Sequence, residues 1–404
     1  MPDTLSVRPS DTYSPLYFLA AVGAGGVAVS FFMWLMFWVP HPDQPVPVFE
    51  DIAAAFATGG IAMQAMIVAA MAAIATFAAI SIRSLIWNLR AMAEWKRSPA
   101  FEKFAATNAQ SQLMTLPLAL AMTINLGFVL GLVFVPGLWS VVEYLFPVAI
   151  LAFLAVGVLA LRTMGAFLGR VLTQGGFNCS ANNSFGQVLP AFAFAMTGVG
   201  MAAPAALSAS PFIAGVSLVL SSFFLITALF IAVLGVILGM RSMMENGAAP
   251  ETAPTLMIVV PIVTVLGILT LRQGHGVGVH FGGHAEAGAN LMYLTQLVGV
   301  QVLFLLFGLL ILAKQGYAQR FLFGRESSAG SYALVCPGVG LAVMLQFWIN
   351  QGLVGAGLVE KFGPAFWALS ALAVASQFAM VWLVLHLNRR HFGRPARVAA
   401  VPAE

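Results

Sequence analysis

The chain has 404 residues, of which 60% are hydrophobic and only 8% are charged. Soluble domains carry about 25% charged residues, so this composition excludes a soluble globular protein and favours an integral membrane protein in a lipid bilayer. The net charge of +4 comes from residues in polar links, so it indicates contact with anionic lipid headgroups and not with nucleic acid.

Apolar stretches alternate with polar breaks along the whole chain, and each stretch has about the 20 residues needed to cross the hydrocarbon core. The pattern predicts an all-α integral membrane protein whose transmembrane domain covers 15–388, between a cytoplasmic segment (1–14) and a basic cytoplasmic tail (389–404). The first apolar stretch is too long for the apolar region of a signal peptide, so it is predicted to be the first span. The ten predicted spans are 15–39, 52–82, 114–135, 139–162, 186–207, 210–239, 252–272, 290–314, 332–354 and 364–388.

Lys and Arg fall mainly on one side of these spans. Of the 18 such residues, only Arg272 and Lys361 lie on the opposite side. Cationic side chains are retained in cytoplasmic loops, so both ends of the chain are predicted to be cytoplasmic. Cys179 and Cys336 then lie on the reducing side of the membrane, where a structural disulfide is not expected.

Short links on the charge-poor side, such as 136–138 and 209–210, predict that consecutive spans form antiparallel hairpins. Each odd span also has a proline near its cytoplasmic end, where the missing N–H would have no partner in any case. These prolines are Pro15, Pro117, Pro190, Pro254 and Pro337. The repeat predicts five hairpins with quasi-fivefold symmetry. The odd helices are expected inside and the even helices outside, because irregular helices are tolerated where they line a cavity.

A ring of five broken inner helices inside five outer ones resembles the tellurite-resistance/dicarboxylate transporter and slow-type anion channel superfamily. The segments 15–40, 174–187 and 331–340 also resemble the bacterial TsoY family, in which some members are selenoproteins. The resemblance implies a bacterial inner-membrane protein that forms a homotrimer with one pore per subunit. It also implies a chalcogen at Cys336, at the cytoplasmic mouth of the ninth span.

In the anion channels of that superfamily a phenylalanine plugs the pore, and the odd spans here offer Phe18, Phe128, Phe194 and Phe347. Phe347 on the last inner helix is the best-placed candidate, although aromatic residues in membrane helices usually serve packing. Neutral polar residues on odd spans suit a pathway that hydrogen-bonds an anion without trapping it, although they also suit interhelical hydrogen bonds. Acidic residues deep in the spans, typical of proton-coupled carriers, are absent. The predicted pore residues are Thr123, Asn125, Thr197, Gly338, Gly340, Phe347 and Asn350.

The predicted function is therefore a membrane channel or carrier for small anions, with sulfur and selenium oxyanions as candidate substrates. The alternative is a membrane thiol oxidoreductase that uses Cys336. This residue precedes Pro337 at a predicted helix start, and a helix N-terminus stabilises a thiolate. The competing interpretation of Cys336 is a small buried hydrophobic residue.

Two polar segments offer further sites. The cytoplasmic segment 175–184 predicts a vestibule formed by Asn178, Cys179, Asn182 and Asn183, with amide donors for an anion, although an ordinary turn and helix cap explain the Asn and Ser residues equally well. Cys179 would then lie on the same side as Cys336, which leaves a reversible pair of the two open. The outside link 273–289 contains His275, His280 and His284. Three imidazoles suit a transition metal, but the many glycines argue against a preformed site, so no metal and no cofactor are predicted.

Overall fold

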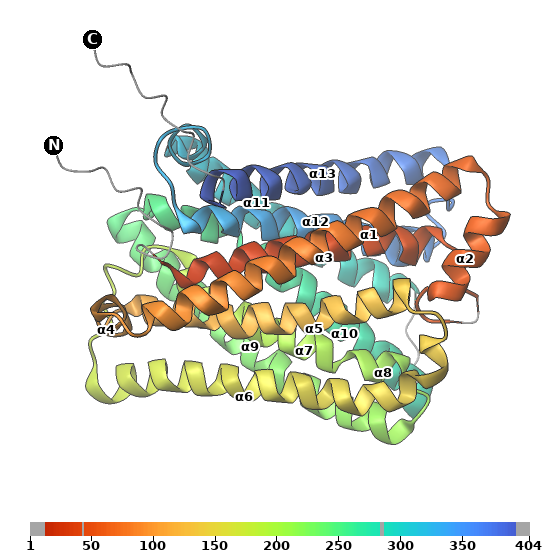
Figure 1. The fold of residues 1–404 in the computed structure, drawn as a ribbon, viewed down its shortest axis with the longest axis horizontal. Coiled ribbons are helices and arrows are strands. Elements are labelled where there is room, and N and C mark those ends of the chain that lie inside the picture. Colours follow the sequence, from red (N-terminus) through yellow and green to blue (C-terminus); the bar gives the residue numbers. More distant parts are fainter. Residues whose placement is uncertain (1–12, 43, 283–286, 393–404) are drawn as a thin grey trace, which may run out of the picture.

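The computed structural model describes residues 13–42, 44–282 and 287–392. Within these ranges the protein contains helices and no strand, and ten helical segments are long and apolar enough to cross a membrane. They run side by side along the bundle (Figure 1). The segments are Pro15–Trp38, Ile61–Trp95, Asn108–Phe134, Leu138–Gln174, Phe185–Leu207, Pro211–Asn246, Pro250–Phe281, Ala287–Lys314, Ala329–Val354 and Pro364–Phe392.

The odd spans form a closed inner ring. Their main helices are α1 (Phe18–Trp38), α5 (Thr115–Phe134), α7 (Leu189–Met201), α10 (Val259–Phe281) and α12 (Val335–Phe347). Helix α1 contacts α5, α5 contacts α7, α7 contacts α10, α10 contacts α12, and α12 contacts α1 again. The ring closes in chain order, so each hairpin occupies one fifth of the wall.

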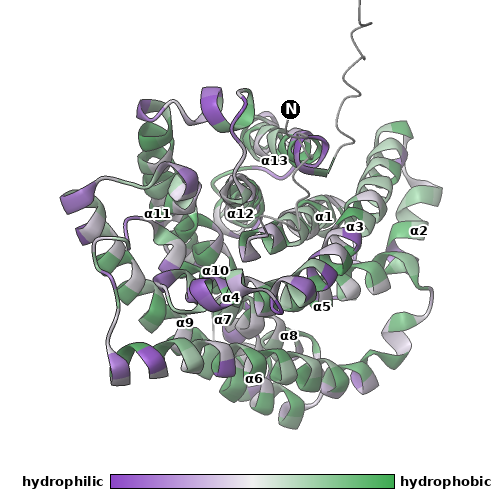
Figure 2. Cartoon of the chain, turned by 60° about the vertical axis from the view of Figure 1, so that its left-hand side comes forward, coloured by the Kyte–Doolittle hydropathy of each residue, from purple (hydrophilic) through white to green (hydrophobic). Residues whose placement is uncertain are grey.

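Each inner helix is covered by the outer helix of the same hairpin. The outer helices are α3 (Ile61–Trp95), α6 (Val142–Gln174), α9 (Pro211–Asn246), α11 (Ala287–Lys314) and α13 (Pro364–Phe392). They pack on α1, α5, α7, α10 and α12 respectively, and Figure 2 shows them around the inner set. The prediction of five hairpins with odd helices inside is confirmed.

Burial separates the two sets. In the most apolar stretch of each odd span between 50% and 94% of the residues are buried, against 17% to 39% in the even spans. The outer helices instead expose large apolar side chains, such as Phe212 on α9, Leu303 on α11 and Trp382 on α13. A helix that is apolar all round is stable when buried or in lipid, so the outer set supplies the surface that faces the hydrocarbon.

Every odd span begins with a 3-10 turn. These turns are Pro15–Tyr17, Asn108–Met114, Phe185–Val188, Pro250–Met257 and Ala329–Leu334. Four of them are capped by a hydroxyl that accepts the backbone N–H two residues on, from Ser14, Thr107, Ser184 and Ser328. The predicted prolines lie within these turns or in the first residues of the α-helix that follows. The repeated start therefore combines a hydroxyl cap, a tight turn and a proline.

The second span begins later than predicted. Gly59 and Gly60 take extended backbone conformations and separate the short helix α2 (Phe49–Thr58) from α3. Helix α3 then continues to Trp95, through half of the predicted cytoplasmic link, and α4 (Pro99–Ala105) is a separate short helix. Long helices can extend beyond the hydrocarbon because their backbone groups are already paired. The prediction from hydropathy therefore placed the end of this helix too early in the sequence.

The seventh span also continues beyond its predicted end. Helix α10 runs to Phe281, so the prediction of an irregular outside loop is wrong over residues 273–281. Gly276 permits close packing there on α8 (Ala203–Leu207), because a Cβ at this position would lie 2.4 Å from the carbonyl oxygen of Ala205. At the end of the helix, His280 Nε2 lies 3.0 Å from the carbonyl oxygen of Ser208. Tertiary contacts therefore keep this glycine-rich segment helical.

A buried polar chain links one outer helix to two inner ones. Gln301 on α11 donates from Nε2 to the Thr264 hydroxyl at 2.6 Å and to the Val260 carbonyl at 3.2 Å. The Thr264 hydroxyl in turn lies 2.9 Å from the Gly340 carbonyl on α12. The groups therefore connect α11, α10 and α12.

Replacing Gln301 by leucine is expected to lower stability by about 1 kcal/mol, since interhelical hydrogen bonds in membranes contribute about 0.6 kcal/mol each. The thermal unfolding midpoint of the purified protein measures the change. Leu303→Ala on the same helix is the matched control, because Leu303 is 63% exposed. Equal midpoints for Gln301→Leu and the control would contradict a stabilising role for the polar chain.

Candidate functional site

A cavity of about 190 Å³ lies on the axis of the inner ring. All five odd spans line it, for example with Gly26 of α1, Asn125 of α5, Met196 of α7, Thr264 of α10 and Gly340 of α12. Most of its lining side chains are apolar, and Gly23, Gly26 and Gly340 are among the small residues. We call it the axial cavity.

A second cavity, of about 810 Å³, adjoins the axial cavity. Its wall includes residues from the links and from the adjoining ends of the helices, among them Pro45, His275, Asn290 and Gly355. We call it the outer chamber, because it lies at the charge-poor end of the bundle. The two cavities share the lining residues Phe32, Met33, Val46, Leu207, Ile268, Arg272 and Phe347.

The lining residues follow one helical stripe on each of two inner helices. On α12 the stripe is Cys336, Val339, Gly340, Val343 and Phe347, and on α10 it is Pro261, Thr264, Val265, Ile268 and Arg272. The offsets of 3, 4, 7 and 11 residues are identical and mark one face of an α-helix. Phe347 and Arg272 are therefore equivalent positions of the repeat, about 16 Å along the helix from the first stripe residue.

Phe347 lies at the boundary between the two cavities. It ends α12, directly before the π-helical turn Trp348–Val354, and its side chain is only 8% exposed. Its ring packs edge-on against Phe37 with 5.2 Å between the centroids. Together with Phe32 and Met33 it forms the apolar part of this boundary, which Arg272 also lines.

Arg272 lines both cavities, and no other Lys, Arg, Asp or Glu is among their described lining residues. Its Nη1 donates to the carbonyl oxygen of Val199 on α7 at 2.8 Å. Arg272 takes part in neither of the ion pairs found among the described residues, Arg241–Glu245 and Arg320–Glu326. The sequence reasoning placed Arg272 at the last residue of a span. The spacing of the lining residues along α10 places Arg272 on the face that borders the axial cavity.

The predicted pore residues separate into two groups. Asn125, Gly340 and Phe347 line the axial cavity, as does Cys336. The others are absent from the lining of either cavity and are engaged elsewhere. Thr123 and Thr197 donate to carbonyls of their own helices, Gly338 accepts from Ser376 of α13, and Asn350 donates to the Gln346 carbonyl.

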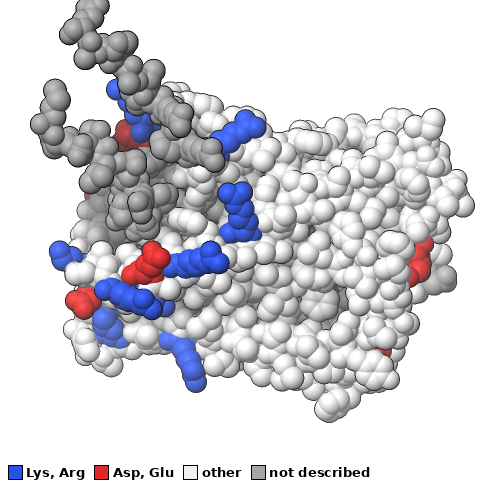
Figure 3. All heavy atoms as spheres, viewed as in Figure 1, with Lys and Arg blue, Asp and Glu red and all other residues white. Residues whose placement is uncertain are grey.

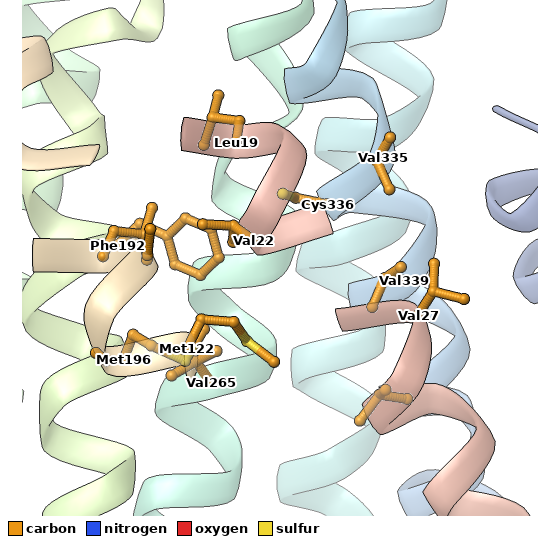
Figure 4. Close-up of a cluster of buried hydrophobic side chains, with 14 of the residues drawn as sticks. Leu19, Val22, Val27, Met122, Phe192, Met196, Val265, Val335, Cys336 and Val339 are labelled. Atoms are coloured by element: carbon orange, nitrogen blue, oxygen red, sulfur yellow. The ribbon is translucent and has the colours of Figure 1, made fainter. Parts of the chain in front are cut away.

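Cys336 is the second residue of α12 and is 4% exposed. Its sulfur points toward α1, where Leu19 and Val22 lie (Figure 4). The preceding 3-10 turn runs directly into α12, and the Val335 N–H donates to the Tyr332 carbonyl. The unpaired N–H groups that would stabilise a thiolate therefore lie at the start of that turn and not beside Cys336.

The polar segment 175–184 lies outside both cavities. The Asn178 carboxamide accepts the N–H groups of Ser180 and Ala181, and its backbone exchanges two hydrogen bonds with the Asn108 side chain. The Asn183 carbonyl accepts from the N–H of Ala249, and Asn182 is buried. Cys179 is exposed, and both cysteines are free thiols. These contacts are those of a turn bonded to its neighbours.

The predicted histidine cluster is divided by the extension of α10. His275 lines the outer chamber, whereas His280 is bonded to Ser208. His284 lies outside the described residues. Across the described part of the chain, no group of three or more His, Cys, Asp or Glu side chains has the arrangement needed for a metal ion.

Charge is distributed unevenly between the two ends. On the face shown in Figure 3, Lys and Arg gather at one end, and the rest of the surface carries few charges. That end includes the exposed pair Arg320–Glu326, in which the hydrogen-bonded guanidinium lowers the pKa of the Glu326 carboxyl. The Tyr17 hydroxyl and His391 Nδ1, 3.2 Å apart, bring the start of α1 and the end of α13 together there.

The wall of the axial cavity is therefore almost entirely apolar, with neutral polar groups at Asn125 and Thr264 and one cation, Arg272, where the outer chamber begins. Such an arrangement can pass or hold a small anion that sheds most of its water. Comparison of the chain with protein-family models and with curated proteins found no match in either.

Proposed function

We propose that the protein is a channel or carrier that moves small anions, including oxyanions of sulfur or selenium, along the axis of the inner ring. The observation that carries this proposal is the pair of adjoining cavities within the ring, one of which all five odd spans line. Structural scaffolds do not need an axial cavity. A pathway does, and irregular inner helices are tolerated where they line one.

The sign of the transported charge follows from the lining. Arg272 faces both cavities, and no acidic side chain is among the described lining residues. A cation would meet an unfavourable potential at this point, whereas an anion would be attracted. The apolar boundary at Phe347 supports a closed pathway in the conformation described.

The orientation and assembly belong to the same proposal. Lys and Arg are retained on the cytoplasmic side, so the basic end, where α1 begins and α13 ends, is proposed to be cytoplasmic and the outer chamber to open outward. The resemblance to the TsoY family and its superfamily favours the bacterial inner membrane and a homotrimer with one pathway per subunit. Chemical cross-linking in membranes tests the trimer.

A thiol oxidoreductase is the second candidate function, and it rests on one observation. Cys336 lines the axial cavity, so a small substrate in that cavity would reach its sulfur. The apolar surroundings at Leu19 and Val22 fit a packed thiol better than a reactive thiolate. In the transport proposal, Cys336 is therefore one of the side chains that form the wall of the axial cavity.

The Cys336→Ser variant separates the two functions. Transport requires the shape of the wall, so the variant is expected to conduct anions within about twofold of the wild type, because serine is nearly isosteric with cysteine. Efflux of chloride, nitrate, thiosulfate and selenite from proteoliposomes measures it. Absence of flux for every anion in folded wild-type protein would refute transport, and loss of flux only in the variant would favour chemistry at the thiol.

A further inference from the structure

We propose that Arg272 forms a binding site for one weakly hydrated monovalent anion, of the nitrate type, at the boundary between the axial cavity and the outer chamber. This inference rests on the proposed function, and it names the binding group and the class of anion. It follows from the placement of the guanidinium, its free donors and the polarity of the walls on either side.

The placement of Arg272 requires an explanation. Helix α10 continues for nine residues beyond Arg272, to Phe281, so the side chain lies within the helical bundle and not in a link. An unpaired charge in such surroundings is costly, and ionisable residues inside membrane spans are functional by default. Within the described part of the chain, Arg272 has no carboxylate partner.

The guanidinium is held in place and still has donors to offer. Its Nη1 bond to the Val199 carbonyl joins α10 to the neighbouring inner helix α7. No other hydrogen bond of this side chain is found among the described residues. Arginine presents five donors in a planar fork, so the remaining N–H groups are free to bind a planar oxyanion from the side of the cavities.

The walls define the class of anion. On the outer side the chamber supplies polar groups, including His275, Asn290 and the hydrogen-bonded hydroxyls of Thr270 and Tyr293. On the axial side the neighbours are apolar, with Val265 on the same helix face and Val199 on α7. An anion that leaves the chamber must therefore lose water, which favours anions with weak hydration.

One positive charge also limits the valence. A monovalent anion bound to Arg272 forms a neutral pair, whereas a divalent anion such as sulfate would leave one negative charge uncompensated against apolar walls. Charges without compensation are strongly disfavoured in such surroundings. The site is therefore expected to prefer nitrate and thiocyanate to chloride, and chloride to sulfate. Among oxyanions of sulfur or selenium it should prefer the monovalent, singly protonated forms to the divalent ones.

Binding is measured directly, without transport, by the line broadening of the chlorine NMR signal that the purified protein produces. Nitrate and thiocyanate should displace chloride from the wild-type protein at lower concentration than sulfate at matched ionic strength. Arg272→Gln should weaken chloride binding about tenfold or more, because hydrogen bonds to charged groups are among the stronger ones. Arg272→Lys should retain part of the binding.

Lys361→Gln is the matched control, because Lys361 is the other cation predicted on this side and is exposed. Chloride broadening that persists unchanged in Arg272→Gln, or falls equally in Lys361→Gln, would overturn the site. If Arg272→Gln does not fold, the order in which anions displace chloride from the wild-type protein decides. Displacement by sulfate at lower concentration than by nitrate would overturn the inference. Proteoliposome flux remains a separate test of the pathway, since a variant without the site can still conduct.

Discussion

Phe347→Ala is expected to increase anion flux by about tenfold or more, since removing a barrier of about 1.4 kcal/mol already changes a rate tenfold. The Phe347 ring lies where the axial cavity meets the outer chamber, held edge-on against Phe37. Its removal joins two cavities that an apolar ring divides. The initial efflux rate of nitrate from proteoliposomes measures the effect.

Phe347→Leu is the matched control for this prediction. Leucine keeps much of the apolar bulk at the boundary, so its flux should stay much closer to that of the wild type. Similar efflux from Phe347→Ala and wild-type vesicles, with equal amounts of folded protein, would show that the barrier lies elsewhere. The remaining candidates at the same boundary are then Phe32 and Met33, which also line both cavities.

Gly276→Ala and Gly274→Ala are expected to change stability in opposite directions, although they lie two residues apart on α10. A Cβ at Gly276 would lie 2.4 Å from the Ala205 carbonyl oxygen and 2.9 Å from its carbonyl carbon. Since both are backbone atoms, α8 must move, and overpacking of this kind costs about 1–3 kcal/mol. A Cβ at Gly274 meets no atom within 4 Å.

Alanine is a better helix former than glycine by about 1 kcal/mol, so Gly274→Ala should raise the thermal unfolding midpoint while Gly276→Ala lowers it. The two variants are compared by unfolding of the purified protein in the same detergent. If both midpoints rise, the segment after Arg272 is not packed on α8. The helical extension that places Arg272 inside the bundle would then need revision.

Periodicity and composition predicted most of the architecture. Ten apolar stretches predict ten helices, because membrane-spanning segments must pair their backbone N–H and C=O groups internally. Several very short links predict five hairpins, because they place consecutive helices side by side. The prolines near the start of every odd span identified the inner set. The structure places these prolines beside a 3-10 turn in each case. Sequence reasoning also placed Asn125, Gly340 and Phe347 on the pathway, and they line the axial cavity.

The errors occurred where hydropathy ceases to be informative. Helix α10 continues through a segment rich in glycine and histidine because Gly276 packs closely on α8 and His280 reaches Ser208. Neither contact is local in sequence. Thr123, Thr197, Gly338 and Asn350 were predicted to line the pore from their helix alone, and they are absent from the described lining of the two cavities.

The sequence by itself determined a membrane protein of ten spans, with its hairpin order and the side on which its cations gather, because these depend on local hydropathy and on charges in links. Only the tertiary structure decided which face of each inner helix borders the axis. That face depends on how five helices rotate against one another to bury their small residues, and it brings Arg272 to the boundary of two cavities. The same rotation turns Phe347 to that boundary and Gly338 toward α13.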